Sequence, residues 1–136
     1  MKNKIIQFIP AIIALLVIVF RYFSNWCIDS ALFCYGTWIH QNALTVIKPL
    51  YFFAIFSLPI AIILVFVPQK VFKSWLKFAA WALPILFIYI AMTPVWDSSW
   101  IPFVRDDAAR LAGVLFSAIS FLIILWEIYR HRKSIY

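Results

Sequence analysis

The sequence has 136 residues, of which 66% are apolar and 12% are charged, and its formal net charge at pH 7 is +7. A soluble domain of this size needs far more polar surface, so the composition excludes a soluble monomer and predicts a protein of the lipid bilayer. The basic excess does not indicate a nucleic-acid partner, because it gathers on one side of the membrane topology derived below.

Four apolar runs along the chain are each about as long as the roughly 20 residues that a helix needs to cross a bilayer. The predicted fold is therefore all-α: an integral membrane protein with four transmembrane helices in an up-down bundle, forming one membrane domain over residues 1–136. The predicted spans are 5–23, 49–67, 78–96 and 109–129. The segments that join them are an outer interfacial loop at 24–48, a basic cytoplasmic turn at 68–77, an outer loop at 97–108 and a cytoplasmic tail at 130–136.

The charged residues separate by side in this topology. By the positive-inside bias, the basic side is cytoplasmic, so the N-terminus and the C-terminus are both expected inside, in a multi-pass protein of the inner (plasma) membrane. The basic side carries eight cations against one acid, Glu127: Lys2, Lys4, Lys70, Lys73, Lys77, Arg130, Arg132 and Lys133. The other side is neutral, with Arg21, Lys48, Arg105 and Arg110 against Asp29, Asp97, Asp106 and Asp107.

The two cysteines, Cys27 and Cys34, both fall in the predicted outer loop, where an oxidising exterior permits a disulfide. Seven helical residues separate two Cα atoms by about 10 Å, which is beyond the roughly 7 Å that a disulfide bridges. Either the loop is irregular and bridged, or it is an interfacial helix with two free thiols. Thiol oxidases of the vitamin K epoxide reductase type are also four-helix membrane bundles, but they use a CxxC pair and a second cysteine pair, so thiol-redox activity is not expected here.

A dense charged group precedes the fourth span. Arg105, Asp106, Asp107 and Arg110 are predicted to form an outer ion-pair and cap cluster, in which an aspartate caps the fourth helix and Asp106 pairs with Arg110 at i, i+4. The same residues also suit recognition of a ligand or a partner, and the two roles are compatible.

Small residues recur along one face of the fourth span. In lipid, helices associate by close approach over small residues and by interhelical hydrogen bonds, so this stripe is predicted to be the packing spine of the bundle. Gly113 is one of two glycines in the chain. The stripe consists of Ala109, Gly113, Ser117 and Ser120.

The sequence offers no catalytic residues, metal site or cofactor-binding motif. Arg21, Arg110 and Glu127 lie near the ends of the predicted spans, and the hydrocarbon region between those ends holds no Asp, Glu, Lys, Arg or His, which argues against an ion-coupled carrier. Pro59 and Pro84 lie near mid-span and either outline a cavity or are packing irregularities. The expected function is that of a non-enzymatic subunit, assembly factor or scaffold whose partners are the lipid bilayer and another membrane protein or further copies of itself. The alternatives are a homo-oligomeric pore or ligand-binding protein, and a protective protein similar in topology to bacteriocin immunity proteins.

Overall fold

The computed structural model describes residues 2–29, 42–96, 98 and 103–133, and every regular element in these ranges is helical. Each of the four long helices is long and apolar enough to cross a membrane, which confirms the all-helical class and the number of candidate spans. The elements are α1 (Lys2–Asp29), the π-helix η1 (Ala43–Ile47), α4 (Lys48–Phe66), α5 (Gln69–Met92) and α6 (Arg105–Lys133).

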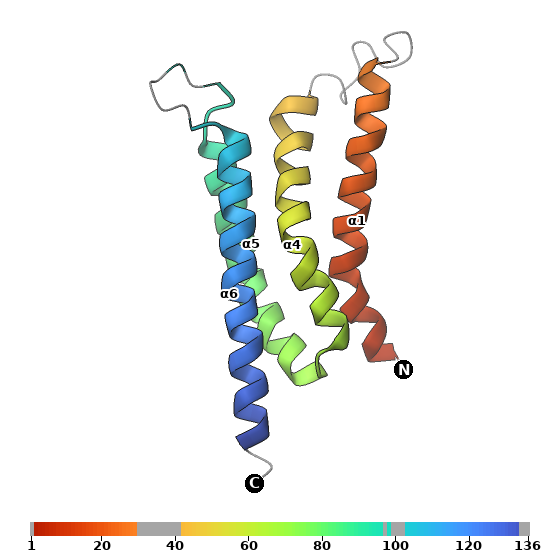
Figure 1. Ribbon diagram of the computed structural model, residues 1–136, viewed down its shortest axis with the longest axis vertical. Helices are drawn as coiled ribbons and strands as arrows, with labels where there is room; N and C mark the ends of the chain where they lie inside the picture. The colour runs from red at the N-terminus through yellow and green to blue at the C-terminus, as the bar shows by residue number, and fades with distance from the viewer. Residues whose placement is uncertain (1, 30–41, 97, 99–102, 134–136) are drawn as a thin grey trace.

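The four long helices alternate in direction, with α4 between α1 and α6 and with α5 behind α6 in the view of Figure 1. α4 packs against both α1 and α6, and α6 packs against α5, whereas α1 and α5 touch only slightly. The first turns of α1 and the last turns of α6 lie at one end of the molecule, named here the proximal end (Figure 1). The opposite or distal end holds the last turns of α1 and α5 and the first turns of α4 and α6.

The helix bounds differ most from the expected spans at α5. Residues 69–77 were expected in a cytoplasmic turn, but the helix begins directly after Pro68 and includes them. The reason is an amphipathic pattern, in which Lys70, Lys73 and Lys77 are exposed while residues between them are buried. The buried residues of these first turns are Val71, Phe72, Trp75 and Ala79.

α1 and the start of α4 also extend beyond the expected spans. α1 continues to Asp29, so residues 24–29 of the expected interfacial loop are helical, as are residues 43–47 at its other end. The expected position of the rest of that loop in the headgroup region concerns residues 30–41, which lie outside the described residues.

An aromatic cluster joins α4, α5 and α6. The ring of Phe116 on α6 lies 5.7 Å from that of Phe53 on α4, and 5.8 Å and 6.2 Å from those of Phe78 and Trp75 on α5. Phe53 also meets Phe87 of α5 at 5.4 Å between ring centroids. Because Phe116 is only 5% exposed and touches both neighbouring helices, it is the centre of the core that these three helices share.

Small residues on α6 allow α4 to come close. A Cβ atom built on Gly113 would lie 2.9 Å from Phe56 Cβ and 3.3 Å from the carbonyl oxygen of Phe53, both on α4. Ala109 is fully buried, and one turn beyond Gly113 the Ser117 hydroxyl donates a hydrogen bond of 2.6 Å to the Phe56 carbonyl. α6 therefore meets the α4 backbone directly, with no larger side chain between them.

α1 is attached to this three-helix unit through a narrow and partly polar face. Its buried residues are small or polar, and none of them belongs to the core cluster of α4, α5 and α6. The Gln7 side chain is 2% exposed, and its amide donates a hydrogen bond of 3.1 Å to the carbonyl of Val67, at the turn that follows α4. The buried residues of α1 are Gln7, Ala14, Ser24 and Cys27.

Replacement of Gly113 tests the close approach of α6 to α4. Gly113→Leu should lower the free energy of unfolding in detergent by about 1–3 kcal/mol or more, because the new side chain has no space against the α4 backbone. The matched control is Ala118→Leu, which introduces the same side chain at an exposed position of the same helix and should change stability little. Equal melting temperatures for the two variants would contradict the packing described here.

Candidate functional site

The Arg105 side chain, at the first residue of α6, binds three backbone carbonyl groups from two other segments. Its Nε atom donates to Thr93 O at 3.0 Å, and Nη2 donates to Ala91 O at 2.9 Å, both at the end of α5. Nη1 donates to Thr45 O in η1 at 3.0 Å. One guanidinium thereby joins the start of α6, the end of α5 and the π-helical entry to α4.

Arg105 and Thr93 provide hydrogen-bond donors to carbonyl groups at the end of α5. The last four carbonyl groups of a helix have no partner within the helix, and a cation near them is also favoured by the helix dipole. Thr93 supplies two partners, with its hydroxyl on Tyr89 O at 3.0 Å and its amide on Ile90 O at 3.3 Å. Arg105 supplies a partner to Ala91 O, and its side chain and backbone amide also bind the next two carbonyls after the helix, those of Thr93 and of Pro94 at 2.9 Å.

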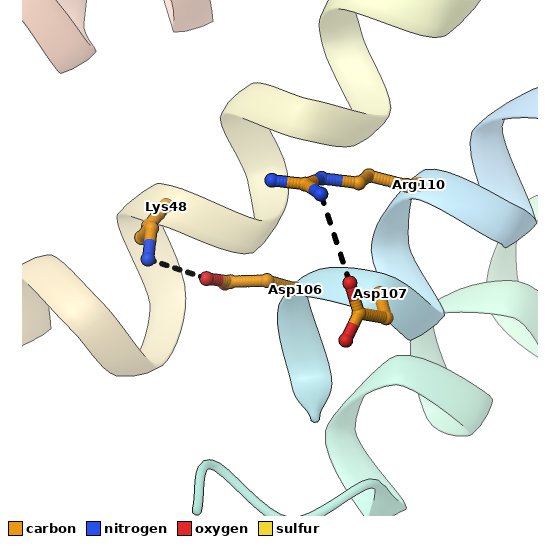
Figure 2. A network of polar contacts seen from close by, with 4 residues as sticks. All are labelled: Lys48, Asp106, Asp107 and Arg110. Atoms are coloured by element: carbon orange, nitrogen blue, oxygen red, sulfur yellow. Dashed lines mark ion pairs between the residues drawn. The ribbon is translucent and has the colours of Figure 1, made fainter. Parts of the chain in front are cut away.

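The remaining charges of the cluster form two ion pairs (Figure 2). Asp106 binds Lys48 of α4 at 2.5 Å, and Asp107 lies 3.7 Å from Arg110, its i, i+3 neighbour. The Arg110 guanidinium also lies 4.2 Å from the ring centre of Phe52 on α4, in a cation–π contact. Asp106 therefore links α6 to α4 instead of pairing with Arg110 as the sequence pattern suggested.

The two aspartates lie inside the first turn of α6 rather than at its cap. The carbonyl of Val104 accepts the first helical hydrogen bonds, from the amides of Asp107 at 2.9 Å and Ala108 at 3.1 Å. The residue at the cap position is thus Val104, which has no side-chain oxygen, and the expectation of an aspartate cap is wrong in this detail. The carboxylates still favour the helix start, since negative charge there opposes the positive end of the helix dipole.

Lys48 and Thr93 belong to this cluster, although the sequence pattern did not assign them to it. Lys48 is far from α6 in the chain, and only the packing of α4 on α6 brings it to Asp106. Thr93 carried a local signal, because a hydroxyl residue directly before a proline is well placed to close a helix end. The charged cluster, defined as Lys48, Thr93, Arg105, Asp106, Asp107 and Arg110, binds parts of this chain to one another.

Two further polar contacts join α5 to α6 nearer the proximal end. The Trp75 indole donates to the fully buried Ser120 hydroxyl at 3.0 Å, and the Ser74 hydroxyl donates to Glu127 Oε1 at 2.9 Å. Ser120 thus contacts α5, whereas Gly113 and Ser117 contact α4, so the small-residue stripe turns from one neighbour to the other along α6.

Cys27 lies on α1 and is 1% exposed, whereas Cys34 is outside the described residues. Because α1 is helical to Asp29, any departure from helical geometry that a bridge needs must come after that residue. The pairing of the two cysteines stays a prediction. Within the described ranges, no three His, Cys, Asp or Glu residues come together as a metal site.

Comparisons of the chain with protein-family models, with curated proteins and with solved structures find no match.

Removal of the Arg105 guanidinium should destabilise the distal end. Arg105→Ala leaves three carbonyl groups without their charged donor, and hydrogen bonds to charged groups contribute about 1.5–3 kcal/mol each where they are shielded from water. We expect Arg105→Ala to lower the free energy of unfolding by roughly 2–4 kcal/mol. Arg105→Lys should cause most of the same loss, because an ammonium group lacks the planar fork that reaches all three carbonyls.

The control for this prediction is Arg110→Ala. Its ion pair is long, and the two side chains are 49% and 40% exposed, so the loss of the ion pair and of the cation–π contact with Phe52 together should cost at most about 1–2 kcal/mol. Guanidinium-chloride unfolding of the three variants in one detergent gives the comparison. A larger effect at Arg110 than at Arg105 would show that the carbonyl contacts do not hold the distal end.

Proposed function

We propose that this chain is a non-enzymatic, multi-pass protein of the inner (plasma) membrane that acts as a subunit, assembly factor or scaffold by packing its outward helix faces against another membrane protein. Four helices that are long and apolar enough to cross a membrane support the membrane assignment. The non-enzymatic role rests on the sequence, which offers no nucleophile paired with a base.

The observation that carries this proposal is the outward position of two helix-interior prolines. Pro59 of α4 and Pro84 of α5 are both exposed, and each removes the amide that would bond the carbonyl four residues earlier. Those carbonyls belong to Ile55, which is 37% exposed, and to Ala80, which is also exposed. Both prolines therefore face outward rather than toward an internal cavity, and we infer that the carbonyls that they release are reached from the outer surface.

A hydrocarbon environment penalises such acceptors. Lipid tails have no hydrogen-bond donor, so a carbonyl that faces them costs several kcal/mol unless the neighbouring backbone adjusts or a donor from another helix reaches it. A partner helix that carries a hydroxyl or amide side chain supplies such a donor, and polar side chains bond across helices in this way. The exposed prolines thus favour a protein neighbour on α4 and α5 over lipid alone.

The low buried share of α1 and α5 leaves room for such a neighbour. In its most apolar 18-residue window, 11% of α1 and 17% of α5 is buried, compared with 33% of α4. α1 and α5 thus keep most of their surface free of contacts within the chain, and a partner can approach α5 without disturbing the α4–α6 contact.

The proposed orientation places the proximal end in the cytoplasm. Lys70, Lys73 and Lys77 lie on the first turns of α5 at that end, whereas the charged cluster at the distal end contains both signs in near balance. The positive-inside bias then puts both termini inside. Reporter fusions after Gln69 and after Tyr136 should behave as cytoplasmic, and one after Ser99 as external. An external reporter at Gln69 would reverse the orientation.

Pro84→Ala tests the assembly role through two effects of opposite sign. Alanine restores the amide to Ala80, so the isolated chain should become more stable by up to about 3 kcal/mol, while the partner loses its acceptor and should dissociate more readily. The measurements are the thermal stability of the purified chain and the mass and composition of the complex in mild detergent.

The matched control is Ile85→Val, which changes an exposed side chain, 62% exposed, without altering the backbone. A complex that survives Pro84→Ala as well as it survives Ile85→Val argues against the outward acceptor as the contact. If the native assembly is instead a closed homo-oligomer, the pore alternative is favoured, and a lone monomer contradicts both readings.

A further inference from the structure

Two polar atoms on the distal half of α1 are buried without a hydrogen-bond partner. They are Nη1 of Arg21 and Oγ of Ser24, and among the described side chains they are the buried nitrogen and oxygen atoms for which no partner is found. Ser24 is 0% exposed, whereas the Arg21 side chain as a whole is partly exposed. Residues three apart lie on the same face of a helix, so the two groups lie one turn apart on one face of α1.

Two unpaired polar groups on one buried helix face destabilise the fold unless a group from outside the chain binds them. An unsatisfied buried polar group destabilises the folded state, a charged one more strongly, and nearly all such groups in folded proteins have partners. The acids whose side chains are described are already engaged: Asp106 by Lys48, Asp107 by Arg110 and Glu127 by Ser74. Asp29 follows Arg21 by eight residues, about 12 Å along the helix axis.

The position of Arg21 along α1 corresponds to a membrane interface. It lies six residues before the end of the candidate span Ile5–Cys27, which is about 9 Å along the helix and within reach of an extended arginine side chain. Exposed aromatic residues surround this level: Tyr22 is 65% exposed and Trp26 61%, and the ring of Phe23 contacts those of Phe20 and Trp26. Aromatic side chains gather where acyl chains meet lipid headgroups.

The chemistry of the two groups fits a phosphate. A guanidinium presents paired N–H donors whose geometry matches two oxygens of a phosphate, and a serine hydroxyl donates to a third. We propose that Arg21 and Ser24 form a binding site on α1 for the phosphate of an anionic membrane phospholipid. The phosphate enters from the partly exposed side of Arg21, and its acyl chains lie along the apolar outer face of α1.

A phospholipid fits better than a carboxylate of a partner helix for a reason of depth. A phosphate is always present at the level of the aromatic residues, whereas a partner helix must place an ionised acid there at a cost. The site lies on α1 and does not depend on the assembly surface proposed for α4 and α5, so the two proposals succeed or fail separately.

The test uses the full-length protein in detergent, with bound lipid measured by native mass spectrometry. The three probes are phosphatidylglycerol, diacylglycerol with the same acyl chains, and inorganic phosphate. The wild-type chain should bind phosphatidylglycerol at least tenfold more tightly than Arg21→Gln does, with Arg21→Lys in between and Ser24→Ala weakened by a smaller factor. Diacylglycerol, which lacks the phosphate, should not distinguish these variants.

The control for general electrostatic attraction is Arg110→Gln, which removes a half-exposed arginine from the same end of the molecule and should leave lipid binding unchanged. Equal binding of phosphatidylglycerol by wild type and Arg21→Gln overturns the proposal, as does an equal loss at Arg110. If inorganic phosphate binds as tightly as the lipid, the site takes free phosphate and the lipid assignment is wrong. Should Arg21→Gln fail to fold, Ser24→Ala and Arg21→Lys still decide the outcome, because a lipid site must weaken in both.

Discussion

The Arg105 guanidinium is the contact on which the distal end of the molecule depends. The end of α5 meets the starts of α6 and of η1 there, and a helix end leaves its last carbonyl groups without partners in the helix. By binding carbonyls of η1 and α5 from the first residue of α6, one side chain fixes where these three segments lie relative to each other. The Lys48–Asp106 pair then adds a direct link between α4 and α6 at the same level.

Away from the distal end, hydrogen bonds and the close approach of helix backbones hold the helices together more than the burial of large apolar side chains does. Many large apolar side chains point outward, as expected for a chain surrounded by lipid, and in lipid the burial of further apolar surface gains little. The hydrogen bonds from Ser117 to Phe56 O, from Trp75 to Ser120 and from Gln7 to Val67 O therefore contribute specificity that the apolar contacts lack. The aromatic cluster around Phe116 fills the space between α4, α5 and α6.

The polar groups divide into those that the chain uses for itself and those that it leaves open. The charged cluster belongs to the first kind, because its side chains contact other parts of the same chain. Nη1 of Arg21 and Oγ of Ser24 belong to the second kind, and the proposed function assigns the carbonyls released by Pro59 and Pro84 to it as well. Open groups of this kind in an apolar environment are where a partner or a lipid headgroup has something to bind, and both proposals above start from them.

The sequence by itself determined the helical class and the number of candidate spans, because these follow from composition and from the length of uncharged runs. It did not determine where α5 begins, because average hydropathy treats the segment with Lys70, Lys73 and Lys77 as a polar turn. On a helix these three lysines lie on the exposed side, and Val71 and Trp75 lie on the buried side. The helical periodicity of that segment does contain the information needed to predict that the helix includes it.

Only the tertiary structure decided which charges meet. The i, i+4 spacing favoured a pair between Asp106 and Arg110. The packing of α4 on α6 instead places Lys48 beside Asp106, and Asp106 forms its ion pair with Lys48. The contacts of Arg105 depend in the same way on the turn between α5 and α6, which brings its side chain to the carbonyls of α5. Nη1 of Arg21 has no hydrogen-bond partner, because no described acid faces it. Sequence spacing specifies neighbours within a helix, whereas contacts between helices depend on their relative position and rotation, which are set by small residues such as Gly113.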